Sequence, residues 1–183
     1  MRRRTALALL ASARWSSANS QHTQNITTLL RSGACVVLLR HAETDPGIGD
    51  PPNFKLSDCS TQRNLSESGR EQSRRIGHWF HKHELLASAV QSSAWCRCRD
   101  TAELAFGLHT VLPALNSTFN KDNLPEPQTQ SLRTRLKNVP IGKFEIWVTH
   151  QVNITALTGE FTAMGEALIV HANGALLART PFS

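Results

Sequence analysis

Short aliphatic runs alternate with amphipathic stretches along the chain. The runs predict buried β-strands near residues 35–40, 88–91, 144–149 and 167–171. Apolar residues at helical spacing predict helices over 67–83, 96–106, 128–137 and 152–158, with a further short helix within 20–34. Alternating strands and helices are typical of an α/β fold, so we expect three layers, αβα, around a mostly parallel sheet.

Turn-forming residues set the limits of several elements. Gly107 is expected to end the helix over 96–106, and Gly159 the helix over 152–158. Asn173-Gly174 between two short runs predicts a terminal hairpin. The stretch 108–127 contains three prolines and polar clusters, and we expect it to be irregular.

Length and charge narrow the class of protein. A chain of 183 residues allows one domain with a sizeable core. The formal net charge of +6 is uneven, because residues 1–34 hold five arginines and no acid, whereas the remainder has 15 basic and 14 acidic residues. A nucleic-acid-binding domain is expected to keep a basic face within its folded part. Nucleic acid is therefore not an expected partner.

Residues 1–24 read as a leader that precedes a single domain over 25–183. An arginine cluster, a short apolar run and small-x-small sequences at 11–13 and 16–18 resemble an export signal, which predicts a periplasmic or secreted protein. A transit peptide and a disordered tail on a cytoplasmic protein stay open as alternatives. The apolar run has about half the length of a membrane span, so we expect no membrane span.

The chemistry of the chain centres on the end of the first predicted strand. Val36 to Leu39 lead directly into Arg40-His41, so the two polar side chains should lie at the carboxyl edge of the sheet, where open α/β folds hold their sites. A guanidinium beside an imidazole suits a phosphoryl group: the guanidinium binds two oxygens while the imidazole nitrogen attacks phosphorus.

Three later stretches carry polar residues of matching kind after the expected strands and loops. They are Gln62-Arg63-Asn64-Leu65-Ser66, Ser92-Ser93-Ala94-Trp95-Cys96-Arg97-Cys98-Arg99-Asp100-Thr101-Ala102 and Trp147-Val148-Thr149-His150. With Arg40-His41 they resemble the histidine phosphatase superfamily, which has the phosphoglycerate-mutase-like fold. The resemblance runs from about residue 35 to 159 and is greatest to the small, phosphohistidine-phosphatase-like branch.

The resemblance implies a role for each polar residue. His41 is the nucleophile that becomes phosphorylated, while Arg40, Arg97 and His150 hold the phosphoryl oxygens. Such a site needs no metal and no other cofactor, since positive charge on the equatorial oxygens comes from the side chains.

Two further arginines, Arg63 and Arg99, lie in these motifs. Arg63 lies in a segment that reaches the phosphate pocket in this branch, and the alternative is a solvated loop arginine. The family pattern Arg-Ala-x-x-Thr-Ala aligns with Arg97, so Arg99 is expected to point elsewhere on its helix.

The backbone next to His41 carries two further expectations. Ala42 stands where the family has glycine, which is a mild departure. To attack, the reactive nitrogen of His41 must be unprotonated, so we expect the other ring nitrogen to donate to a backbone carbonyl near Ala42 or Glu43.

A general acid is harder to assign. Relatives place a carboxylate after a Leu-Pro-x-Leu segment, and here the sequence at 112–115 has alanine at the expected place. Asp122 and Glu126 are the candidates in the following loop. If neither serves, protonation of the leaving group is weak, and that would matter most for alkyl phosphates.

The cysteines and histidines suggest a disulfide and not a metal site. Cys59 is a candidate partner of Cys96 or Cys98 in an exported protein, which would tie the loop after His41 to the helix over 96–106. The histidines at 78, 81 and 83 and the Cys-x-Cys segment lack the paired spacing of structural zinc sites.

The sequence therefore predicts a metal-independent phosphatase that acts through a phosphohistidine on His41. Its expected partner is a small phosphorylated substrate or a phosphoprotein. A sugar-phosphate mutase is disfavoured because Gly47 replaces the asparagine that follows the first motif in mutases. The alternative from another class is a phosphate- or phosphoprotein-binding module of the same fold with little turnover.

Overall fold

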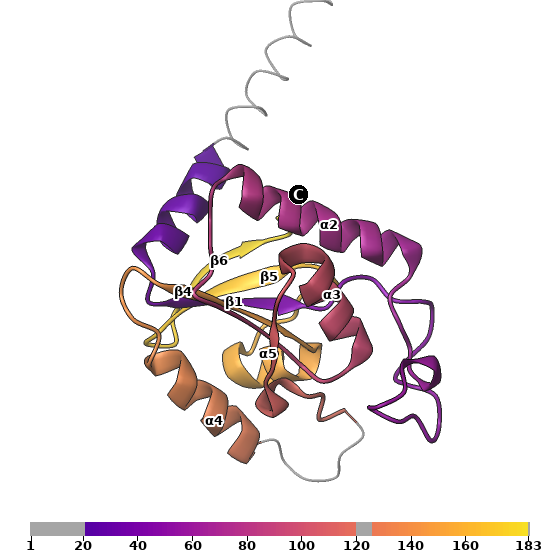
Figure 1. Ribbon diagram of the computed structural model, residues 1–183. Coiled ribbons are helices and arrows are strands. Elements are labelled where there is room, and N and C mark those ends of the chain that lie inside the picture. The colour runs from indigo at the N-terminus through magenta and orange to yellow at the C-terminus, as the bar shows by residue number, and fades with distance from the viewer. Residues whose placement is uncertain (1–20, 120–125, 183) are drawn as a thin grey trace, which may run out of the picture.

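The structure, a computed structural model, describes residues 21–119 and 126–182. Within these residues six strands form one sheet in the order β3-β2-β4-β1-β5-β6 (Figure 1). The strands are β1 Cys35–Arg40, β2 Ala89–Ser92, β3 Thr110–Val111, β4 Phe144–Thr149, β5 Ala167–His171 and β6 Leu176–Thr180. The pairs β1–β4, β2–β4 and β2–β3 are parallel, whereas β5 and β6 pair antiparallel.

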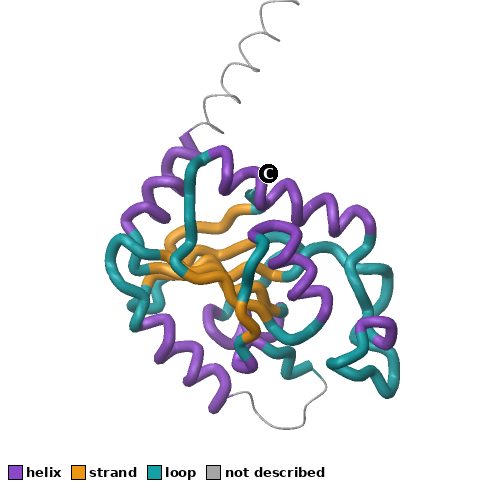
Figure 2. The backbone as a smooth tube through the Cα atoms, in the orientation of Figure 1, coloured by secondary structure: helices purple, strands orange, loops and turns teal. Residues whose placement is uncertain are grey.

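Helices cover both faces of this sheet (Figure 2). They are a helix over residues 21–32, α2 Glu67–Lys82, α3 Cys96–Phe106, α4 Glu126–Lys137 and α5 Gln151–Thr158, with 3₁₀ turns η1 Cys59–Thr61 and η2 Pro113–Leu115. One apolar cluster joins Val37 and Leu39 to the helix over 21–32, α2 and α3, and a second joins Val36 and Leu38 to α4 and α5. The three-layer α/β fold predicted from the sequence is thereby confirmed.

The central strand β1 fixes where polar side chains gather. It pairs with β4 in parallel register, with Arg40 opposite Thr149. Because both strands end at this level, the residues that follow them, His41 and His150, emerge at the same edge of the sheet.

Most predicted elements form within one or two residues of their expected limits. Gly107 and Gly159 are the C-caps of α3 and α5, and β5 and β6 form the predicted hairpin. The stretch expected to be irregular nevertheless contains β3 and η2. Each is only two or three residues long, too short for a hydrophobic period to show in the sequence.

The predicted leader lies mostly outside the described residues, which begin at 21. Residues 21–24 are helical and continue without a break to residue 32, where Ile26 and Leu30 are buried. In the described parts of the chain, no helix has both the length and the apolarity needed to cross a membrane.

The helices α2 and α3 pack closely on one face of the sheet. The predicted stripe of Ile76, Trp79 and Phe80 on α2 is buried. At Gly77 the helices approach so closely that a methyl group would overlap the carbonyl oxygen of Ala105. The close packing of α2 against α3 therefore depends on glycine at this position.

Replacing Gly77 with alanine should destabilise the fold. Helix propensity alone would favour alanine by about 1 kcal/mol, but displacing the Ala105 backbone should lower the free energy of unfolding by about 1–3 kcal/mol. Urea unfolding measures the difference, with Arg75→Ala on the exposed face of the same helix as control. A Gly77→Ala variant as stable as the control would contradict the close packing.

Candidate active site

A cavity of about 510 Å³ lies at the carboxyl edge of β1 and β4. Its lining includes the five residues that the sequence analysis singled out as catalytic or substrate-binding: Arg40, His41, Arg63, Arg97 and His150. They come from the ends of two strands, one loop and the first turn of α3. Segments far apart in the sequence are therefore brought to one place.

The ring of His41 is buried and held in one orientation. Its backbone N–H donates to Thr149 O at 3.0 Å, which continues the pairing of β1 with β4. Its Nδ1 lies 2.9 Å from the carbonyl oxygen of Ala42, so a neutral ring donates from Nδ1 and carries its lone pair on Nε2. The hydrogen bond expected near Ala42 or Glu43 is confirmed, with Ala42 as the acceptor.

The surroundings of His41 keep its ring neutral. Burial is the largest effect, and together with the positive charges of Arg97, Arg40 and Arg63 it lowers the pKa of His41 to about 3. The hydrogen bond to Ala42 opposes this shift but does not cancel it. At neutral pH the Nε2 atom is therefore an unprotonated nucleophile.

His150 lies beside His41, with ring centroids 5.5 Å apart. Its Nε2 is 2.8 Å from Ser93 Oγ, and Ser93 is itself held by the side-chain oxygen of Asn116 at 3.2 Å. Burial, followed by the influence of His41 and the arginines, lowers the pKa of His150 well below its ordinary value. The cavity thus contains two neutral imidazoles side by side.

The guanidinium groups of Arg40 and Arg63 are partly held by backbone carbonyls. Arg40 donates to Thr162 O at 2.6 Å, and Arg63 donates to Gly47 O at 2.8 Å. The Nε atoms of Arg40, Arg63 and Arg97 are buried and have no hydrogen-bond partner among the described residues. Buried donors of this kind need an acceptor, which an anion such as phosphate supplies.

Arg97 makes a two-pronged ion pair with Asp50. Its Nη1 and Nη2 lie 2.7 and 3.2 Å from the two carboxylate oxygens, and both side chains are buried. Asp50 also accepts from the indole of Trp95 at 3.0 Å and from the Arg63 amide at 3.1 Å. Burial alone would raise the pKa of Asp50, but these hydrogen bonds and the charge of Arg97 outweigh it, so the pKa is lowered.

Thr101 connects the backbone at His41 to the first turn of α3. Its hydroxyl accepts from the Ala42 amide at 3.0 Å and donates to Arg97 O at 2.7 Å. The relative positions of His41 and Arg97 are therefore set by a short hydrogen-bonded path. Arg99, which follows Arg97 by two residues, is exposed, as expected.

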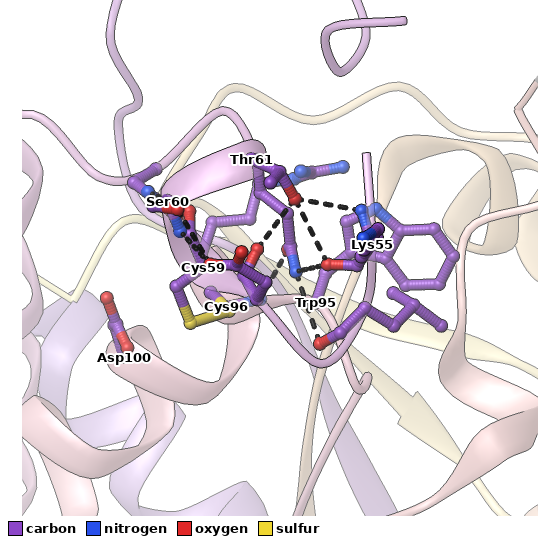
Figure 3. Close-up of a disulfide and its surroundings, with 12 residues drawn as sticks. Lys55, Cys59, Ser60, Thr61, Trp95, Cys96 and Asp100 are labelled. Atoms are coloured by element: carbon purple, nitrogen blue, oxygen red, sulfur yellow. Dashed lines mark hydrogen bonds between the residues drawn. A yellow bond between two sulfur atoms is a disulfide. The ribbon is translucent and has the colours of Figure 1, made fainter. Parts of the chain in front are cut away.

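The disulfide joins Cys59 to Cys96, one residue before Arg97. Figure 3 shows it with Lys55, Thr61 and Trp95 around it. Of the two expected pairings the structure contains this one, and Cys98 is a buried free thiol whose pKa burial raises to about 12. The bond ties the loop after β1 to α3.

Of the two candidate general acids from the sequence, the structure describes one, and that one does not line the cavity. Asp122 lies outside the described residues. Glu126 is the first residue of α4, is exposed, and lies 3.3 Å from Arg133, away from the lining of the cavity. Among the described residues that line the cavity, the carboxylate belongs to Asp50, which the sequence analysis missed. Its loop has no periodic pattern, so no signal in the sequence paired it with Arg97.

Comparison with known proteins gives a family and a fold. Residues 36–118 match the model of the histidine phosphatase superfamily, branch 1. The comparison with curated proteins found no match.

Solved structures share the fold at low sequence identity. TTHB049 from Thermus thermophilus is 18% identical, with 79% of this chain and 98% of that chain covered and a TM-score of 0.55. SixA from Agrobacterium tumefaciens, a candidate phosphohistidine phosphatase, is 18% identical over 80% and 97% of the two chains, with a TM-score of 0.56. A phosphoglycerate mutase from Thermus thermophilus is 19% identical over 79% and 97%, with a TM-score of 0.57.

The motif match and the shared fold agree with each other. Over residues 36–118 the chain is similar to the histidine phosphatase superfamily, branch 1, and the described residues have the phosphoglycerate-mutase-like fold.

The lowered pKa of His41 predicts how stability depends on pH. Below pH 6.5 an unfolded histidine takes up a proton that folded His41 does not, so the unfolded state binds more protons. The free energy of unfolding therefore decreases as the pH is lowered. One such group lowers the free energy of unfolding by up to about 1.4 kcal/mol for each unit by which the pH falls in this range. Urea unfolding between about pH 6.5 and pH 5 should show a smaller slope for His41→Asn than for the wild type.

Leu86→Ser, which changes an exposed side chain outside the cavity and removes no titratable group, is the control and should retain the wild-type slope. Equal slopes for His41→Asn and the wild type would show that His41 takes up a proton in the folded state as it does in the unfolded state.

Proposed function

We propose that the chain is a metal-independent phosphatase that transfers a phosphoryl group to Nε2 of His41 and then to water. The observation that carries this proposal is a buried, neutral His41 with Nδ1 bound to Ala42 O, in a cavity that Arg40, Arg63 and Arg97 also line. The substrate is a phosphomonoester or a phosphoramidate.

In the first step the Nε2 lone pair forms a bond to phosphorus while the bond from phosphorus to the leaving atom breaks. The arginines bind the equatorial oxygens, and the neutral ring of His150, which lies beside His41, donates its N–H to one of them. In the second step water attacks phosphorus, the N–P bond breaks, and inorganic phosphate leaves with the water proton. His41 is then neutral again.

Asp50 is the best-placed carboxyl group to protonate the leaving atom. A phosphate dianion and Asp50 compete for Arg97, so binding of substrate should release the carboxylate. A carboxyl beside a dianion, without its guanidinium partner, has a raised pKa and can carry a proton. Asp50 thus takes the role for which the sequence suggested Asp122 or Glu126.

The disulfide supports a periplasmic or secreted location. Cytoplasmic thiols are kept reduced, whereas a bond between Cys59 and Cys96 persists in an oxidising compartment. The arginine-rich leader in the sequence agrees with export.

Phosphate release from an aryl phosphate in the presence of a chelator tests the mechanism. The wild type should be active, and His41→Ala should lose activity by at least about 1,000-fold because the nucleophile is gone. Glu126→Ala is the matched control and should retain activity, since its side chain pairs with Arg133 outside the cavity. Phosphatase activity retained by His41→Ala would contradict the phosphohistidine mechanism.

The alternative is a phosphate-binding module with little turnover, which the sequence at 112–115 favours because alanine stands where relatives carry the general acid. Tight binding of vanadate by the wild type without any phosphate release would establish it.

Asp50→Asn tests the two roles given to this carboxyl group, which are to compete with phosphate for Arg97 and to protonate the leaving atom. Removing the competing charge from Arg97 should tighten binding of inorganic phosphate. Turnover of an alkyl phosphate should fall about 100- to 10,000-fold, the usual contribution of a general acid, with a much smaller loss for an aryl phosphate whose leaving group needs no proton. Equal losses of turnover for both substrates would rule out Asp50 as the acid.

A further inference from the structure

The residues that line the cavity fall into two groups. The guanidinium, phosphate-binding floor consists of Arg40, Arg63 and Arg97 with His41 and His150, and the rest of the lining is mostly apolar. The large apolar members, which form the apolar wall, are Ile48, Phe54, Trp95, Phe119, Val152 and Met164. Ile48 is 93% exposed and Phe119 is 51% exposed, although both border a cavity. Large apolar side chains that stay exposed around one cavity indicate a ligand-binding surface.

The loop that carries Ile48 and Phe54 is anchored at several points. Gly47 O accepts from Arg63, Asp50 is bound to Arg97, and the Lys55 amide donates to Thr61 Oγ1 at 2.8 Å. The disulfide closes the same loop onto α3 (Figure 3). These contacts anchor the loop on both sides of Ile48 and Phe54.

The apolar wall continues on the neighbouring elements. Phe54 packs against Trp95 with ring centroids 5.7 Å apart, and Phe119 borders the cavity from the segment after η2. Other exposed apolar side chains, such as Leu86 and Leu108, do not line this cavity. The grouping at the cavity is therefore more than the scatter of apolar residues found on any surface.

We propose that the substrate is a small soluble phosphate compound whose organic group is apolar, such as a phosphomonoester of an alkyl alcohol or a phenol. Its phosphoryl group binds the guanidinium floor and its organic group packs against Ile48, Phe54 and Phe119. The inference rests on the proposed function and adds the substrate class. A volume of about 510 Å³ suits a complete small molecule.

Among the described residues, the polar lining beyond the phosphate-binding floor is sparse. Ser117 and Gln151 border the cavity, and the Gln151 side-chain oxygen already accepts from the Thr162 amide at 2.9 Å. A sugar phosphate would bring several hydroxyl groups to a wall with few partners for them, and burying unpaired hydroxyl groups is unfavourable. The wall therefore selects against sugar phosphates.

Calorimetric titration with methyl-, butyl- and hexylphosphonate tests the inference without depending on hydrolysis. Phosphonates carry the same anionic group but do not turn over. In the wild type each added methylene that is buried should tighten binding up to about fourfold. Equal affinity for methylphosphonate and hexylphosphonate would overturn the proposal.

Two double variants locate the effect. Ile48→Ser with Phe119→Ser should reduce the ratio of hexylphosphonate to methylphosphonate affinity at least about tenfold, because the apolar wall is lost. Leu86→Ser with Leu108→Ser, which changes two exposed apolar residues outside the cavity, should leave that ratio at its wild-type value. An equal reduction in both variants would contradict the proposal.

The outcomes also separate this inference from the phosphatase mechanism. Phosphonate binding that tightens with chain length, while 4-butylphenyl phosphate releases no phosphate, would support the apolar ligand and contradict the phosphatase. Phenyl phosphate and 4-butylphenyl phosphate have leaving groups of similar reactivity. Phosphate release that is equally fast from both would support the phosphatase and contradict the apolar ligand. Binding to phosphatidic acid vesicles in preference to hexylphosphonate would overturn the assignment to a small soluble compound.

Discussion

The parallel pairing of β1 with β4 is the constraint on which the site depends. Arg40 lies opposite Thr149, so the chain leaves both strands at one level and His41 emerges beside His150. The His41 amide donates to Thr149 O, which makes His41 part of the sheet's hydrogen-bond pattern. A shift in this register would separate the two histidines.

The second constraint is electrostatic. Arg40, Arg63 and Arg97 surround a buried histidine, and their charges and its burial favour the neutral ring. Asp50 offsets part of this positive charge by binding Arg97, and the disulfide at Cys96 fixes the loop from which Asp50 comes. The protein thus contains its own carboxylate where a phosphate oxygen would bind, and the apolar wall is held by the same loop.

Most of the fold and much of the site could be predicted because their signals are local. Arg40-His41 and His150 each follow an aliphatic strand, and Arg97 opens a helix after another strand, so the topology alone brings them to one edge. Asp50 could not be predicted, because its loop has no periodic pattern and its partner is 47 residues away. The choice of Cys96 over Cys98 likewise depends on the face of α3 that meets the loop, which residue spacing does not reveal.

The central claim is that His41 stays neutral among three arginines with its proton on Nδ1. Nitrogen-15 NMR of the histidine side chains, assigned with His41→Asn, tests it most directly. The account predicts the Nδ1–H neutral form for His41 and shifts that stay constant from about pH 8 to about pH 5. A His41 ring that titrates near pH 6.5, or that carries its proton on Nε2, would contradict the account.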